Sequence, residues 1–200
     1  MRLIHILICV IVASIFSTNA SAQVYFNGPV EFAGTGCGAG SYTVSNDVPN
    51  ILTIQFSAYD AAYPTDSAAS GLQRSACSFT VPIHVPAGYQ ISTLSADWRV
   101  YGEGAVEFFR EYFFAGEIGE SKLTIPSGTI FERDQMQIGS CAERRAKDIL
   151  LRVNSAVSAA NDGNYNYIAI DSVDQSLALT LELYLEKCPS PIPSILNLLL

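Results

Sequence analysis

The sequence predicts an all-β protein, an antiparallel β-sandwich of about eight to ten strands with two disulfides. Three observations lead to this prediction. Segments of alternating apolar and polar residues recur along the chain, turn residues separate them at regular intervals, and no segment is a convincing amphipathic helix. The apolar residues of 105–115 fit either a helical i, i+4 stripe or a covered strand, and their aromatic content and flanking glycines favour the strand. The cysteines add the two disulfides to this prediction, because an even number in a secreted chain indicates disulfide bonds.

The first 22 residues have the three parts of a secretory signal peptide. Arg2 is basic, an apolar run extends from Leu3 to Phe16, and Ala20-Ser-Ala22 provides a cleavage site, so we expect cleavage between Ala22 and Gln23. The apolar run is shorter than the roughly 20 residues of a membrane-spanning helix. We therefore expect a secreted, extracellular protein, or a periplasmic one in a Gram-negative bacterium, with no membrane span after cleavage.

A single domain at 23–188 is expected to follow, because no change of composition marks a linker. A Pro-rich and apolar tail at 189–200 ends the chain. Loss of Arg2 with the signal leaves 10 basic against 19 acidic side chains, a net charge of −9. An acidic surface without clusters of Lys or Arg argues against nucleic acid and anionic membranes as partners.

Cysteines remain at four places after the signal: Cys37, Cys77, Cys141 and Cys188. Four cysteines allow three connectivities. We favour Cys37 with Cys77 and Cys141 with Cys188, because each bond then closes a loop within one half of the chain. In the chain-entropy model each loop of this size stabilises the fold by about 4 kcal/mol. The wide spacing and the single remaining histidine argue against a zinc site, and nothing in the sequence indicates a cofactor.

Strands are expected where the alternation is regular. In the first half they lie at 23–32, 41–45, 51–59, 77–85 and 89–101. In the second half they lie at 105–115, 121–125, 129–131, 148–157, 165–170 and 176–187. Small and polar residues predict a long surface loop at 60–76, and an irregular segment is expected at 133–145.

The stretch from Cys77 to Val85 is central to this interpretation. Its alternation places Cys77 on the inner face of a strand and His84 on the opposite face. A Ser-His-Asp triad would have to use His84, and no G-x-S-x-G motif accompanies it. A surface histidine on a disulfide-linked strand is therefore the expectation.

Short motifs around the cysteines also resemble a known family. They are Gly34-Thr-Gly-Cys37, Arg74-Ser-Ala-Cys77, Val85-Pro-Ala-Gly-Tyr89, Asp97-Trp-Arg99, Ser140-Cys141 and Leu183-Tyr-Leu-Glu-Lys-Cys188. In the same order and contexts, they resemble the secreted family called domain of unknown function 4360. Trp98, the insert at 66–72 and the tail after Cys188 depart from its pattern. The resemblance implies a secreted, disulfide-linked, β-rich domain without an established activity, and it supplies no catalytic residue.

Aromatic residues expected on outer strand faces motivate the first functional hypothesis, a non-catalytic extracellular binding or surface and matrix module. They are Tyr42, Tyr59, Tyr63, Trp98 and Tyr184. Exposed aromatic side chains contact ligands well, and the partner would be a carbohydrate or an extracellular protein. A lone tryptophan is also typical of core packing.

Two other functions remain open. A secreted carboxylate-dependent hydrolase, such as a glycosidase, could use Glu107 and Glu111, which share a face if their segment is a strand. A solvated acidic face is the plainer interpretation of these residues. Alternatively, the apolar tail at 189–200 could join subunits of a structural assembly.

Overall fold

The computed structural model describes residues 23–114, 117–138, 141, 145–170 and 179–189. The expected signal peptide and all but the first residue of the expected tail lie outside these residues. The described residues contain thirteen strands and one short 3₁₀ helix, η1, at Thr65–Ser67.

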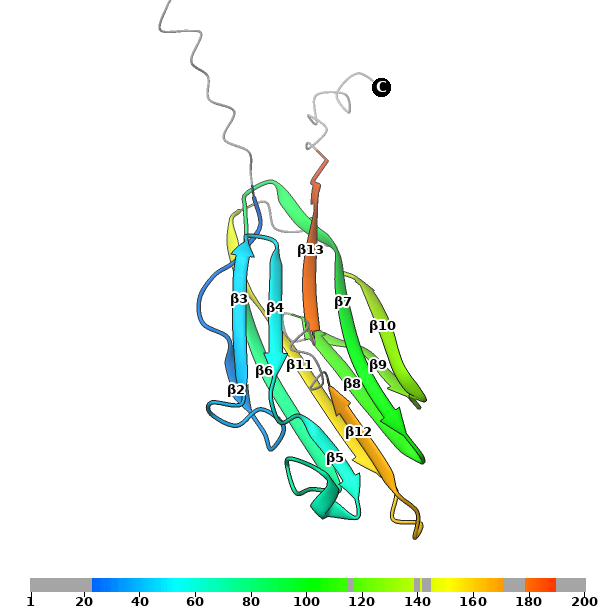
Figure 1. The fold of residues 1–200 in the computed structure, drawn as a ribbon. Helices are drawn as coiled ribbons and strands as arrows, with labels where there is room; N and C mark the ends of the chain where they lie inside the picture. Colours follow the sequence, from blue (N-terminus) through cyan, green and yellow to red (C-terminus); the bar gives the residue numbers. More distant parts are fainter. Residues whose placement is uncertain (1–22, 115–116, 139–140, 142–144, 171–178, 190–200) are drawn as a thin grey trace, which may run out of the picture.

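Two antiparallel sheets pack face to face (Figure 1). The first sheet has the order β1-β6-β11-β8-β9, and β2 also pairs with β6. Its strands are β1 (Tyr25–Phe26), β2 (Glu31–Ala33), β6 (Arg74–Val85), β8 (Val106–Phe114), β9 (Glu117–Thr124) and β11 (Lys147–Ala159). The expected fold class, an antiparallel β-sandwich, is confirmed.

The second sheet has the order β3-β4-β13-β7-β12-β5, with β10 on the other side of β7. Its strands are β3 (Tyr42–Val48), β4 (Ile51–Phe56), β5 (Asp60–Tyr63), β7 (Tyr89–Glu103), β10 (Gly128–Gln137), β12 (Asn166–Ile170) and β13 (Leu179–Lys187). On one side, β7 pairs with β13 along its first part and with β12 along its last four residues. On its other side, β7 pairs with β10 from Thr93 to Gly102. Strand β7 therefore lies in the middle of the second sheet and pairs with β10, β12 and β13.

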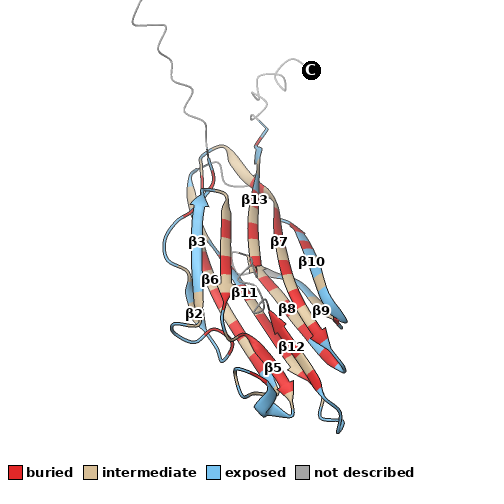
Figure 2. Cartoon of the chain, in the orientation of Figure 1, coloured by how far each residue is buried: buried red, intermediate tan, exposed pale blue. Residues whose placement is uncertain are grey.

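Alternation along the strands separates the core from the two outer faces (Figure 2). In β6 the side chains of Cys77, Phe79, Val81, Ile83 and Val85 are all at most 1% exposed, as the sequence predicts. Because side chains point to opposite faces with a period of two, the residues between them lie on the outer face of the first sheet. The core is filled by the inward residues of both sheets.

Both expected disulfides are present, Cys37–Cys77 and Cys141–Cys188. The first ties a strap, residues 33–37, to the outer edge of β6. Gly34 lies in the strap with φ +137°, and a Cβ there would be 2.2 Å from the carbonyl oxygen of Ala76. Only glycine fits such a close approach without displacing the backbone.

Two expectations about irregular segments are wrong. The segment 60–76 is not one loop, because it contains β5, η1 and the start of β6. The carboxylate of Asp60 accepts hydrogen bonds from the backbone of Ala69 and Ser70 at 2.6 and 2.9 Å, which folds the segment back on itself. Residues 133–137, expected to be irregular, are instead the last part of β10, which pairs with β7.

No helix in the described part of the chain has the length and apolar character to cross a bilayer. The two disulfides are compatible with an extracellular protein, since such bonds persist in oxidising compartments.

We expect the Cys37–Cys77 bond to matter far more for stability than His84. His84 lies on the outer face, with Nδ1 2.8 Å from Asp148 Oδ1 and its ring stacked on Tyr25. The double variant Cys37→Ala/Cys77→Ala should lose about 4 kcal/mol of unfolding free energy, because an unfolded-state loop is released. His84→Ala should lose at most about 1 kcal/mol, as for other surface pairs.

Urea denaturation followed by the fluorescence of Trp98, the one tryptophan of the chain, measures both values. A larger loss for His84→Ala than for the cysteine variant would contradict this account of β6.

Candidate functional site

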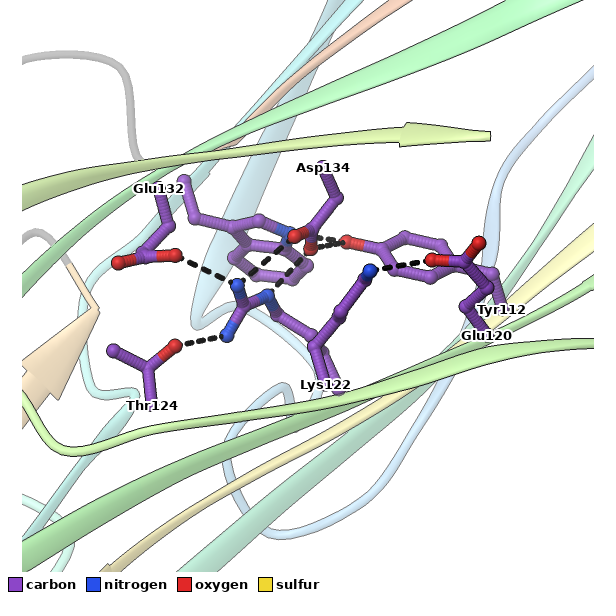
Figure 3. Close-up of polar contacts among 8 residues, drawn as sticks. Tyr112, Glu120, Lys122, Thr124, Glu132 and Asp134 are labelled. Carbon is purple, nitrogen blue, oxygen red and sulfur yellow. Dashed lines mark hydrogen bonds and ion pairs between the residues drawn. The ribbon is translucent and has the colours of Figure 1, made fainter. Parts of the chain in front are cut away.

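A buried ion pair joins the two sheets on the side where their edge strands β9 and β10 meet (Figure 3). Arg110 from β8 donates to both carboxylate oxygens of Asp134 from β10, at 2.5 and 2.9 Å. The two side chains are 2% and 4% exposed. Arg110 also donates to Glu132 Oε2 at 2.9 Å and to Thr124 Oγ1 at 2.7 Å.

A tryptophan and a tyrosine extend this network into the core. The indole Nε1 of Trp98 donates to the hydroxyl of Tyr112 at 2.7 Å, and that hydroxyl donates to Asp134 Oδ2 at 2.6 Å. The ring of Phe108 packs edge-on against Trp98 and lies 4.9 Å from the Arg110 guanidinium carbon. We call Trp98, Arg110, Tyr112, Thr124, Glu132 and Asp134 the buried network.

The electrostatics of the buried network favour a fixed structural role. Burial opposes the charge of Arg110, but the hydrogen bond and charge of Asp134 outweigh it and raise the pKa of Arg110. Burial, together with the Asp134 charge, raises the pKa of Tyr112 far above its usual value. The guanidinium therefore stays charged and the phenol stays protonated at physiological pH. Because the donors and acceptors bind one another, we assign the buried network to holding β10 against β8.

The outer face of the second sheet carries a strip of aromatic residues across β10, β7 and β12. We call it the tyrosine face, consisting of Tyr101, Phe131, Tyr165 and Tyr167 with the charged residues Arg99 and Glu103. Phe131 is 79% exposed and Tyr165 is 49% exposed, while Tyr101 and Tyr167 are half-buried. Strand register explains the grouping, since Arg99 lies opposite Phe131 and Glu103 lies opposite Tyr167.

Contacts within the tyrosine face set the positions of its side chains. The guanidinium carbon of Arg99 is 5.7 Å from the centre of the Phe131 ring. The rings of Tyr101 and Tyr167 have their centroids 6.1 Å apart. The Tyr101 hydroxyl donates to Glu103 Oε2 at 3.2 Å, and the negative charge of Glu103 raises the pKa of Tyr101. The strip spans two strand spacings, about 10 Å, and combines rings with a guanidinium and a carboxylate.

Two of the aromatic candidates are not on an outer face, so their expected placement is wrong. Trp98 is 1% exposed and Tyr59 is 0% exposed. The bend at Ser57 and Ala58 ends β4 and resets the alternation, so that Tyr59 turns into the core and donates to Ser155 Oγ at 2.8 Å. Trp98 shares its side of β7 with the buried Ala96 and so faces inward.

The other candidates lie at or near the surface but apart from one another. Tyr63 is partly buried against the core at the end of β5. Tyr42 stacks on Phe32, with ring centroids 3.8 Å apart, and Tyr184 donates to Glu182 at 2.6 Å.

Glu107 and Glu111 share the outer face of β8, as a strand predicts, with Phe109 between them. Four strand residues separate their Cα atoms by about 13 Å. The carboxylate of Glu111 accepts a hydrogen bond at 3.1 Å from Ser121 on β9. A glycosidase needs carboxyl groups about 5 to 9.5 Å apart, so this arrangement does not favour that pair.

The expected strands at 89–101, 129–131 and 165–170 contain the aromatic residues of the tyrosine face, but only the pairing of β10 and β12 with β7 brings them onto one face. The sequence does carry one signal, since Phe131 and Arg133 alternate with Glu132 and Asp134 along one continuous strand. Arg110 was also recognisable, because it falls on the same face as Phe108 and Tyr112. Its partner Asp134 was not, since only the packing of the sheets brings them together.

No group of three or more His, Cys, Asp or Glu side chains within the described ranges is arranged to hold a metal ion. Asp162, in the turn before β12, instead accepts hydrogen bonds at 2.9 Å from the backbone of Asn164 and the side chain of Asn166. These donors lower the pKa of Asp162 and close the turn.

Comparison with known proteins places the chain in a family. Residues 28–188 match the family model described as Domain of unknown function (DUF4360). The chain belongs to this family. The resemblance carried by the cysteine motifs is thereby confirmed, and the DUF4360 description names no activity. No curated protein matches the sequence.

Solved structures similar to this DUF4360 domain are distant. TmCBM61, in complex with β-1,4-galactotriose, has 11% identity and a TM-score of 0.34, over 80% of this chain and 89% of that one. The family 11 carbohydrate-binding module from Clostridium thermocellum has 9% identity and a TM-score of 0.23, over 84% and 91%. The tailspike protein 4 of bacteriophage CBA120 has 16% identity and a TM-score of 0.30, over 78% of this chain and 19% of that one. With TM-scores below 0.5, these likenesses carry no inference about function.

The buried network generates a stability prediction. Asp134→Ala should lower the unfolding free energy by about 3 to 5 kcal/mol, because it leaves the buried Arg110 charge with only the partly exposed Glu132 as a carboxylate partner. Removing both charges, in Arg110→Met/Asp134→Leu, should cost clearly less than the single change, since no unpaired charge then remains. Denaturant titrations of the two variants and the wild type test this difference.

Arg133→Ala is the matched control on the same strand, because it breaks an exposed pair with Asp97 and should lower the unfolding free energy far less than Asp134→Ala does. A double variant less stable than Asp134→Ala would contradict the role assigned to the network.

Proposed function

We propose that this DUF4360 domain is a non-catalytic extracellular module that binds a carbohydrate across the tyrosine face, after removal of a signal peptide at 1–22. The observation that carries the proposal is the exposure of Phe131, at 79%, beside the half-buried Tyr101 and Tyr167 on one sheet face. Large rings that remain in contact with water on a packed sheet indicate a surface kept for a partner.

The chemistry of the tyrosine face suits a sugar chain better than a purely apolar partner. Pyranose rings present C–H groups on their faces and hydroxyls on their edges. Aromatic rings pack against the C–H groups. The Glu103 carboxylate can accept hydrogen bonds from the sugar hydroxyls, and the tyrosine hydroxyls can donate to them or accept from them. Because the rings are held by neighbouring strands, little side-chain entropy is lost on binding.

The described surroundings of the tyrosine face also favour binding over hydrolysis. Glu103 is the one carboxylate of the strip, and its partner is the Tyr101 hydroxyl. Asp97, farther along β7, is held by two hydrogen bonds from Arg133 at 2.6 and 2.7 Å. The strip thus offers stacking surfaces and one hydrogen-bonded carboxylate, and the two-carboxylate arrangement of a glycosidase is not among its described residues.

Substitution of the exposed rings tests the proposal. A glycan array with the protein of residues 23–200 should identify a saturable ligand. Phe131→Ala and Tyr101→Ala should each weaken its binding about tenfold or more, because each removes a ring from the contact surface. Neither variant should alter the denaturation midpoint greatly, since both side chains lie on the outer face.

Tyr25→Ala is the control, as Tyr25 is 40% exposed on the first sheet and lies outside the tyrosine face. Loss of binding in Tyr25→Ala but not in the other two variants would overturn the assignment. Release of reducing ends from the bound glycan, abolished by Glu103→Gln or by Glu107→Gln, would instead establish a hydrolase.

A further inference from the structure

The first sheet has a shallow hollow on its outer face, away from the tyrosine face. Its volume is about 280 Å³. Strands β6, β11 and β8 line it together with the strap that the Cys37–Cys77 disulfide attaches. Its lining side chains include Arg74, Ser78, Phe109, Arg152 and Asn154.

Register across the three strands explains why the sheet is hollowed here. Ala76 of β6 lies opposite Ala156 of β11, and Ala156 lies opposite Phe109 of β8. Two adjacent alanines leave the floor low, while the Phe109 ring forms one wall and Ala33 of the strap lines the other side. The floor is therefore set by small side chains, and the larger polar groups surround it.

Two arginines, Arg74 and Arg152, line this hollow. In the described part of the chain neither Arg74 nor Arg152 forms an ion pair, whereas Arg110 and Arg133 each bind an aspartate. Arg152 is oriented by neutral groups, with Nε 3.2 Å from Asn154 Oδ1 and 3.4 Å from Ser78 Oγ.

We propose that the hollow binds an acidic sugar through its carboxylate or sulfate group. The guanidinium fork of arginine matches such oxyanions with two parallel hydrogen bonds. Phe109 supplies an apolar surface for the face of a sugar ring, and Ser78 and Asn154, joined by a 2.7 Å hydrogen bond, supply polar partners for its hydroxyls. The volume lies just below the range of about 300 to 1,000 Å³ found for drug-sized ligands, so the occupant is about one sugar unit.

Glu107 and Glu111 lie beside the hollow and add negative charge on one side of it. Both are on the outer face of β8 on either side of Phe109, and Ser121 holds Glu111 toward β9. The acids thus lie on the β8 side, while the guanidinium groups approach from β6 and β11. A ligand with an anionic group at one end and hydroxyls at the other fits this separation of charge.

Titration with matched monosaccharides tests the site. D-Galacturonate, D-galactose, D-galactose 6-sulfate and acetate are added separately to ¹⁵N-labelled protein of residues 23–200, and amide shifts are followed by NMR. At least one of the two acidic sugars, galacturonate or galactose 6-sulfate, should shift amide signals of β6 and β11 around the hollow. Which of the two binds shows whether the site prefers a carboxylate or a sulfate. Galactose and acetate should bind at least tenfold more weakly, because one lacks the charge and the other lacks the ring.

Charge-matched variants complete the test. Arg74→Gln and Arg152→Gln should each weaken binding of the acidic sugar about tenfold, while Arg145→Gln, an exposed arginine outside the hollow, should leave it unchanged. Phe109→Ala should also weaken it, without loss of net charge. The proposal is overturned if neither acidic sugar binds, if acetate binds as tightly, or if Arg145→Gln weakens binding as much as Arg152→Gln.

Discussion

The ion pair between Arg110 and Asp134 holds the two sheets together on the side of the sandwich where the edge strands β9 and β10 lie. Two sheets of this kind are held mainly by apolar packing, which is non-directional and does not fix how their edges meet. Here a buried guanidinium on β8 binds a buried carboxylate on β10, and the two atoms of the shortest contact are 2.5 Å apart. A charge pair in a dry interior has strict geometry, because any displacement leaves an unpaired charge. The ion pair therefore fixes the position of β10 relative to β8 of the first sheet.

Both proposed surfaces follow from this sandwich arrangement. Strand β10 presents Asp134 to the core and Phe131 to solvent, since neighbouring positions along a strand alternate between faces. Holding β10 in place therefore also holds one end of the tyrosine face. On the other sheet, the Cys37–Cys77 bond holds the strap beside β6 and so forms one side of the hollow. The two surfaces lie on opposite faces of the sandwich, so each can be altered without changing the other.

The scarcity of basic residues gives the arginines of this chain distinct roles. Arg110 stabilises the interior, Arg133 pairs with an exposed aspartate, and Arg99 lies against the Phe131 ring. Arg74 and Arg152 are left facing the hollow on the first sheet. In an acidic protein, a local pair of guanidinium groups produces a field opposite in sign to that of the remaining surface, which favours anionic groups at that place alone.

The sequence by itself determined the sandwich class, most strands and the outward position of His84, while it left three disulfide connectivities open, of which the structure has the favoured one. These follow from local patterns, because a period of two assigns each side chain to a face without knowledge of its neighbours. It did not determine which strands lie side by side. Alternation places Tyr59 on an outer face, but the bend at Ser57 and Ala58 resets it. The sequence likewise does not show that Arg110 meets Asp134, or that Arg74 and Arg152 line one hollow. Only the tertiary structure decided which residues from distant strands meet, since strand pairing and sheet packing are set by contacts across the whole chain.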